Sequence, residues 1–190
     1  MIKVIRGDRT SQTTDVIVNA ANTHLLAGSG VCGAIHRVAG PELERECRGI
    51  GDCPTGEARS TDAYDLPCKH VIHAVAPRYS DGTRGESELL RRCYQSIFAL
   101  TEKHGIKSIS IPAIGTGIYR YPIKEATEIA FDTTLVAKKK QELLVEFVCF
   151  DKNTATVYEE TYQRCWVDLH PFHFMIFLLM LQNEKTNRHN

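Results

Sequence analysis

Short apolar runs alternate with helix-like stretches along residues 1–165 of this chain, and no other feature limits its fold as strongly. Strands that alternate with helices pair in a mostly parallel sheet that helices cover on both faces. The apolar runs predict strands at 2–5, 16–18, 57–61 (an edge strand), 71–75, 108–111 and 143–150. The stretches between them predict helices at 30–39, 42–48, 88–103, 122–138 and 153–165. The fold class is therefore α/β, a single three-layer α/β/α domain with a mixed, mostly parallel central sheet.

Composition and charge exclude several classes of protein. The 190 residues suffice for one domain with a substantial core, and 23 basic residues balance 23 acidic ones. Zero net charge argues against a surface for duplex nucleic acid, which usually carries a basic excess. The seven cysteines include no C-x-x-C pair, and the N-terminus has no apolar signal segment, which together favour a reduced, cytoplasmic protein.

The last residues, 166–190, do not fit the strand and helix pattern. Their apolar run, 172–181, is much shorter than the ~20 residues that cross a bilayer, so no membrane partner is expected. A packed extra helix and a partner-binding segment both remain open for this tail, whose role the sequence does not identify.

Two asparagines and a glycine-rich loop follow the predicted strand 16–18. The segment reads Asn19-Ala-Ala-Asn22, and Leu25-Leu-Ala-Gly-Ser-Gly-Val-Cys-Gly-Ala-Ile-His36 leads from it into a helix. Glycines let the backbone approach a ligand closely, and the N–H groups at a helix start attract phosphate. Asparagine suits ribose hydroxyls, because it is an uncharged donor and acceptor. The segment predicts a ligand that carries both phosphates and sugars.

A second glycine loop, Ala113-Ile-Gly-Thr-Gly-Ile-Tyr119, stands between a buried strand and a helix that begins at Pro122. It is either a tight turn or a second phosphate contact, and we favour the contact. Neither loop has the lysine of a P-loop, so a diphosphate that is bound but not cleaved is expected. Segments 19–22, 113–119 and 150–151 all follow strands, and parallel sheets bind ligands at that edge. One crevice is expected to collect all three.

Residues 28–33 also match G-x-G-x-x-G, the dinucleotide fingerprint, and Asp52 lies at nearly the expected distance downstream. That fingerprint must directly follow a strand, but residues 19–27 intervene here. Segment 42–48, just before Asp52, is charged and helical rather than a strand. A nicotinamide-dependent dehydrogenase is therefore not predicted.

Together with Asp8, these motifs closely resemble the macro domain, a family that binds ADP-ribose. The chain looks most like the branch that hydrolyses ADP-ribose from proteins and acetyl esters, because Gly33-Ala-Ile-His36 and Asp52-Cys-Pro-Thr-Gly56 match it. The resemblance covers residues 1–165. It implies ADP-ribose, O-acetyl-ADP-ribose and mono-ADP-ribosylated proteins as partners, no metal and no other cofactor.

The resemblance also implies roles for individual residues. Asp8 would accept a hydrogen bond from the adenine amino group, and Asn22 would hold the distal ribose. Phe150 would pack on adenine, although a plain core position is an alternative. Family members often carry isoleucine where this chain has Arg9. The full set of expected ADP-ribose contacts is Asp8, Arg9, Ala21, Asn22, Gly28, Ser29, Gly30, Val31, Cys32, Gly33, Ala113, Gly115, Thr116, Gly117, Ile118, Tyr119 and Phe150.

Asn22, Cys32 and His36 are the candidate catalytic residues. The hydrolytic branch usually has aspartate in place of Cys32, and a thiol is a poorer base than a carboxylate near neutral pH. Cys32 is open to three roles: a nucleophile, a metal ligand with His36 but without an evident third ligand, or a small side chain that lines the ribose pocket. The substitution also leaves open a reader module that binds ADP-ribose without turnover. Two further interpretations are structural: Asn19 supports the turn, and His73 is a core histidine.

Overall fold

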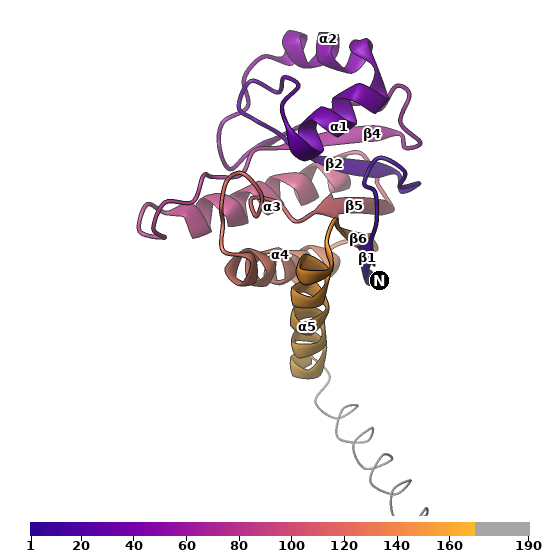
Figure 1. Cartoon of the computed structure of the whole chain (residues 1–190). Coiled ribbons are helices and arrows are strands. Elements are labelled where there is room, and N and C mark those ends of the chain that lie inside the picture. The colour runs from indigo at the N-terminus through magenta and orange to yellow at the C-terminus, as the bar shows by residue number, and fades with distance from the viewer. Residues whose placement is uncertain (170–190) are drawn as a thin grey trace, which may run out of the picture.

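A six-stranded sheet forms the middle layer of the molecule, with helices on both of its faces (Figure 1). The computed structural model describes residues 1–169. The strands are β1 (Ile2–Arg6), β2 (Val16–Ala20), β3 (Ala58–Asp62), β4 (His70–Ala74), β5 (Ser108–Pro112) and β6 (Leu144–Cys149). The helices are α1 (Gly30–Ala39), α2 (Pro41–Ile50), α3 (Glu86–Lys103), α4 (Ile123–Lys138) and α5 (Lys152–Leu169). The predicted α/β/α architecture is confirmed.

The strand order is β1-β6-β5-β2-β4-β3, and every pairing is parallel except that of β3 with β4. The predicted edge strand 57–61 is thus confirmed within one residue. Because the other five strands run in the same direction, the loops that follow them meet at one edge of the sheet. This edge carries both glycine loops.

Alternation along the strands divides the core between the two faces, because successive side chains point to opposite sides. In β2, Val16 and Val18 belong to the larger cluster, which α3, α4 and α5 cover, whereas Ile17 belongs to the cluster under α1 and α2. Asn19 shares the face of Ile17, and its register partner in β4 is His73. Both polar side chains therefore point toward α1 and α2.

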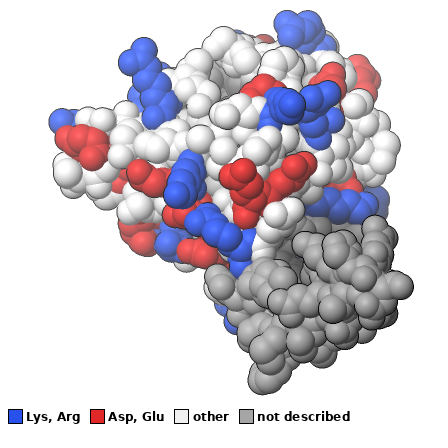
Figure 2. Space-filling view, turned by 60° about the horizontal axis from the view of Figure 1, so that its bottom comes forward, with Lys and Arg blue, Asp and Glu red and all other residues white. Residues whose placement is uncertain are grey.

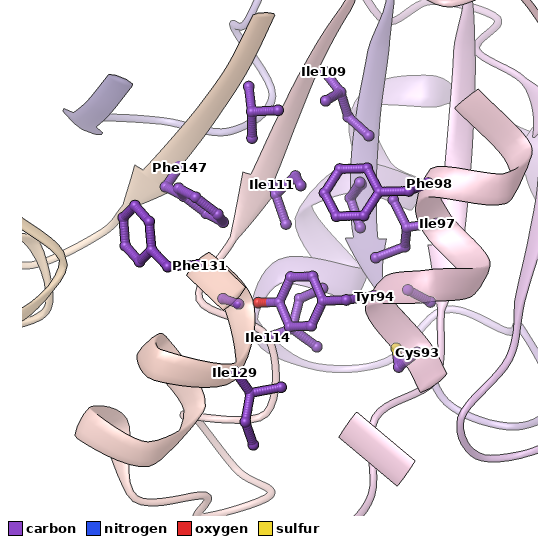
Figure 3. Close-up of a cluster of buried hydrophobic side chains, with 14 of the residues drawn as sticks. Cys93, Tyr94, Ile97, Phe98, Ile109, Ile111, Ile114, Ile129, Phe131 and Phe147 are labelled. Carbon is purple, nitrogen blue, oxygen red and sulfur yellow. The ribbon is translucent and has the colours of Figure 1, made fainter. Parts of the chain in front are cut away.

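Aromatic side chains fill the larger cluster between the sheet and α3, α4 and α5 (Figure 3). Phe131 of α4 lies 4.9 Å from Phe147 of β6, centroid to centroid, and Tyr158 of α5 lies 5.2 Å from Phe147. All three side chains are fully buried. Aromatic rings at these separations and tilts contribute more to the free energy of unfolding than the burial of their apolar area alone.

Proline and glycine set most helix boundaries where the sequence predicts them. Gly40, with φ of 82°, ends α1, and Pro41 opens α2 at a position where its missing N–H has no helical partner. The last helix differs from its prediction, because α5 continues to Leu169 instead of ending at Cys165. Residues 153–169 contain neither glycine nor proline, so nothing in the sequence stops the helix there.

The tail prediction for 166–190 lies largely outside the described residues, which end at Leu169, the last residue of α5. In residues 1–169, no helix is long and apolar enough to cross a membrane. On the face shown in Figure 2, Lys and Arg side chains are interspersed with Asp and Glu, and neither charge forms a continuous stripe.

Replacing Phe131 by alanine is expected to lower the free energy of unfolding by about 3–5 kcal/mol, because it empties a buried ring site in the aromatic cluster. Urea denaturation followed by circular dichroism measures the loss. Val136→Ala is the matched control on the same helix, since Val136 is 56% exposed, and its effect is expected to stay within about 0.5 kcal/mol. Equal losses in the two variants would contradict this packing.

Candidate ligand-binding site

A pocket with roughly 740 Å³ of empty space, part of it open to solvent, lies at the carboxyl edge of β2, β4 and β5. None of the described residues that line it carries a charge. They are Ala20, Ala21, Asn22, Gly28, Ser29, Gly30, Val31, Cys32, Ala74, Ala76, Ala113, Gly115, Gly117, Ile118 and Tyr119.

The first glycine loop folds back on the helix that it starts. A Cβ added to Gly33 would lie 2.1 Å from the carbonyl oxygen of Gly28, so only glycine lets these two backbone segments meet. Helix α1 begins at Gly30 with no acidic residue in its first turn, and the side chain of Ser29 makes no cap hydrogen bond within the described chain. The N–H groups at this helix start therefore face the pocket without a capping side chain, as an anion site requires.

The side chains of Asn22 and Cys32 both donate hydrogen bonds to one backbone carbonyl group in the segment between them. Asn22 Nδ2 donates to the oxygen of Leu26 at 2.7 Å, and the Cys32 thiol donates to the same oxygen at 3.4 Å. Asn22 Oδ1 accepts the backbone N–H groups of His24 and Leu26. The Asn22 amide keeps a second N–H group for a ligand. Cys32 is only 5% exposed, and its sulfur also accepts a 3.6 Å contact from Asn19 Nδ2.

The second glycine loop closes on itself opposite the first. Gly115 has φ of 83°, and its carbonyl accepts the N–H of Tyr121 at 3.0 Å. The Thr116 hydroxyl donates to the Ala113 carbonyl at 2.9 Å, so Thr116 closes the turn and does not line the pocket. Tyr119 does line it, and the guanidinium of Arg78 lies 4.8 Å from the centre of its ring. The loop therefore offers backbone groups and one aromatic wall.

Three predicted adenine contacts, Asp8, Arg9 and Phe150, lie outside this pocket but on the same edge of the sheet, after β1 and β6. Phe150 is 74% exposed, so the alternative that it is a core residue is wrong, and Arg9 covers its ring at 5.5 Å. Asp8 Oδ1 accepts the backbone N–H and the hydroxyl of Thr10, and these hydrogen bonds lower the pKa of the carboxyl group. The loop after β1 thus contributes a carboxylate, Asp8, and a guanidinium, Arg9, that covers the exposed ring.

Asn19, His36 and His73 are buried behind the pocket wall. His73 is fully buried and lies 3.0 Å from both Asn19 Nδ2 and Thr61 Oγ1, so its interpretation as a core histidine is confirmed. Asn19 is fully buried as well, in keeping with the structural role predicted for it. The structure does not bring His36 to the pocket, because it lies one helical turn beyond Cys32 and faces the core.

The sequence analysis missed three alanines that line the pocket. Ala20, Ala74 and Ala76 lie at or just after the carboxyl ends of β2 and β4, where their small side chains leave room for a ligand. Their position at the end of a buried strand is the sequence signal that could have identified them as lining residues. Asp52 lies in a loop, where its carboxylate pairs with exposed His24 at 2.8 Å, so the fingerprint interpretation stays excluded.

Comparison with known proteins agrees with this geometry. The family model described as "Macro domain" matches residues 18–130. An O-acetyl-ADP-ribose deacetylase of Pantoea vagans is 47% identical over 163 residues, which are 83% of this chain and 95% of that protein. The chain belongs to the macro domain family.

Solved structures of two other macrodomains superpose on the chain. The Oceanobacillus iheyensis macrodomain with ADP has a TM-score of 0.83 and 38% identity, and covers 87% of this chain and 91% of its own. The Trypanosoma brucei macrodomain in complex with ADP-ribose has a TM-score of 0.79 and 42% identity, and covers 84% of this chain and 68% of its own.

Replacing Gly33 by alanine is expected to lower the free energy of unfolding by about 1–3 kcal/mol, because the new Cβ would push the Gly28 carbonyl out of the loop. Gly49→Ala makes the same change within α2, where nothing lies within 4 Å of the added Cβ. This control is expected to be neutral or slightly stabilising, as alanine favours a helix. Chemical denaturation of the two variants measures the difference, and matching values would rule out the backbone contact.

Proposed function

We propose that this chain binds ADP-ribose and hydrolyses it from mono-ADP-ribosylated acidic side chains, or deacetylates O-acetyl-ADP-ribose. The observation that carries the proposal is the pocket between two glycine loops, which joins an uncapped helix start to the Asn22 amide. The name of the Pantoea vagans relative and the ligands of the two solved macrodomains support it.

The uncharged pocket suits a diphosphate that is held but not cleaved. Backbone N–H groups of residues 28–32 and of Gly115, Gly117 and Ile118 would bind its oxygens, and the dipole of α1 adds positive potential at Gly30. Gly33, a further predicted contact, is not among the described residues that line the pocket. The absence of lysine and arginine from the described lining also leaves no cation to stabilise charge on a departing phosphate. We therefore propose that the reaction takes place at the distal ribose rather than at the diphosphate.

The two ends of the ligand would meet different surfaces. Adenine would stack beside Phe150 and Arg9, with its amino group donating to Asp8. The distal ribose would lie near Asn22 and Cys32, the two residues that share the Leu26 carbonyl. Adenine thus lies after β1 and β6, the diphosphate crosses the loop after β5, and the ribose lies after β2, in the spatial order of the strands.

In the hydrolysis, water adds to the ester carbonyl or to the anomeric carbon of the distal ribose, and the bond to the carboxyl group breaks. The products are ADP-ribose and a free carboxylate, either acetate or the protein side chain. The proton of the attacking water passes to the substrate diphosphate or to solvent, because no described lining side chain is an ionised base. Cys32 and Asn22 position the loop against the ribose.

A second function, that of a reader that binds without turnover, is favoured by Cys32 itself. Its thiol is nearly buried and donates to the Leu26 carbonyl, so it does not point a base at a water molecule. The two functions share every binding contact and differ only in whether ADP-ribose is released.

Release of ADP-ribose from a protein modified on aspartate and glutamate tests the proposed function directly. The full chain is expected to release it in repeated turnovers, and ADP-ribose is expected to raise its melting temperature by mass action. AMP should give a smaller thermal shift, because it lacks the second phosphate and the distal ribose. A thermal shift without release would identify a reader, and no shift with either ligand would refute the site.

Asn22→Ala is expected to reduce the turnover rate far more than the affinity for ADP-ribose. The Asn22 amide holds the Leu26 carbonyl and leaves one N–H for the ribose, so its loss disturbs alignment at the moment of attack. Calorimetry gives Kd, and the release assay gives kcat. A parallel fall of both by the same factor would show that Asn22 only holds the ligand.

Cys32→Ala is expected to keep most of the activity, and Cys32→Asp to preserve or raise it, if the thiol only positions the loop. A new carboxylate near the diphosphate should weaken binding through repulsion of like charges. The rates of wild type and both variants across pH 6 to 9 measure this. A nucleophilic thiol predicts the reverse: Cys32→Ala is inactive, and iodoacetamide inactivates the wild type unless ADP-ribose protects it.

A further inference from the structure

Three side chains that bind metals well meet behind the wall of the pocket. They are His36 of α1, Cys47 of α2 and His73 of β4, and their ligand atoms all lie within 4.8 Å of one another. None of them lines the pocket. From the sequence, His36 and Cys32 were considered as two metal ligands without an evident third. The fold instead groups His36 with Cys47 and His73, which are remote from it in the chain.

The fold brings them together because β4 points His73 at the face that α1 and α2 cover. Val71, His73 and Val75 alternate onto this face, and Cys47 packs there in the same core cluster as Val71 and Val75. Cys47 Sγ lies 3.7 Å from His73 Nε2, and the rings of His36 and His73 lie 6.1 Å apart, centroid to centroid. The cluster therefore joins both helices to the sheet.

The imidazole ring of His36 lacks a hydrogen-bond partner in the described part of the chain. His36 is 6% exposed, yet neither Nδ1 nor Nε2 has a partner there, and Asn19 Oδ1 is also buried without one. An unsatisfied buried polar group costs about 1–3 kcal/mol, so two of them beside one thiol are unusual. A ligand that accepts the lone pair of an imidazole nitrogen would satisfy His36.

The ligand atoms of the cluster suit a cation. An imidazole nitrogen binds a metal through its lone pair, and a thiol binds a metal as a thiolate after it loses its proton. The negative charge of Glu44 acts on both His36 and Cys47.

We infer that His36, Cys47 and His73 form a structural zinc site. Zinc prefers imidazole and thiolate ligands, whereas calcium and magnesium prefer oxygen ligands. In a tetrahedral zinc site, sulfur and nitrogen ligands lie about 3.6 Å apart, close to the 3.7 Å between Cys47 and His73. The Thr61 hydroxyl, 3.0 Å from His73 Nε2, is available as a neutral fourth ligand.

Zinc binding would also give the unpartnered Oδ1 atom of Asn19 a hydrogen-bond donor. Metal at His73 Nε2 puts the ring proton on Nδ1, where it needs an acceptor. Turning the Asn19 amide by half a rotation about Cβ–Cγ directs its unpartnered Oδ1 to that proton and moves Nδ2 away from the Cys32 sulfur. Cys47 gives its thiol proton to solvent, which leaves one net positive charge near Glu44. The inference stands independently of the proposed function, because no ligand of the site touches the pocket.

The test measures zinc in the full chain after expression with added zinc, removal of any tag, and dialysis against zinc-free buffer. About one zinc ion per folded chain is expected. His36→Gln and Cys47→Ala should lose it, whereas His24→Gln and Cys68→Ser should keep it. His24 is an exposed histidine, and Cys68 is a half-buried cysteine outside the cluster.

Cobalt(II) in place of zinc gives a second readout, the charge-transfer absorption of a thiolate bound to the metal. Wild type and Cys32→Ala should both show this absorption, and Cys47→Ala should not. A chelator should lower the melting temperature of the wild type, a measurement that needs no variant to fold. Folded wild-type chain without zinc and without the cobalt absorption would overturn the inference, as would an absorption that survives in Cys47→Ala.

Discussion

Strand β2 is covered by helices on both faces, and this double burial determines where the molecule can bind anything. Val16, Ile17 and Val18 are at most 1% exposed, so no side chain in the middle of the strand reaches solvent. Only the residues after its carboxyl end emerge, and the parallel arrangement brings the ends of β4, β5 and β6 to the same edge. This one constraint determines where the glycine loops, the Asn22 segment and Phe150 lie.

The sequence predicts most of the fold because its boundaries are set by local chemistry. Gly40 and Pro41 separate two helices through a left-handed backbone and a missing N–H, and both effects are visible without a structure. The end of α5 was predicted too early, at Cys165, although Pro171 follows Leu169 closely and is the local signal for the observed end. Phe150 was ambiguous because an aromatic residue at a strand end is buried or exposed according to its neighbours, and Arg9 reaches it from the loop after β1.

The candidate site is predictable where a motif is continuous and unpredictable where contacts join distant segments. Residues 28–33 and 113–119 were recognisable as segments that approach a ligand, although Gly33 is not among the described lining residues. The contact of Gly33 with the Gly28 carbonyl, and the Leu26 carbonyl that Asn22 and Cys32 share, depend on how a loop folds back. The grouping of His36 with Cys47 and His73 depends on the packing of two helices on β4, which no spacing in the chain encodes.

The neutral pocket has a consequence for competition among anions. A basic pocket attracts every phosphorylated molecule over a distance of several ångströms, and salt weakens that attraction. Backbone N–H groups act only at hydrogen-bond range, so an anion is held only if its shape brings its oxygens onto both loops. Inorganic phosphate and AMP, which cannot place oxygens on both loops at once, should then be held more weakly than ADP-ribose, and occupancy of the pocket should depend little on ionic strength.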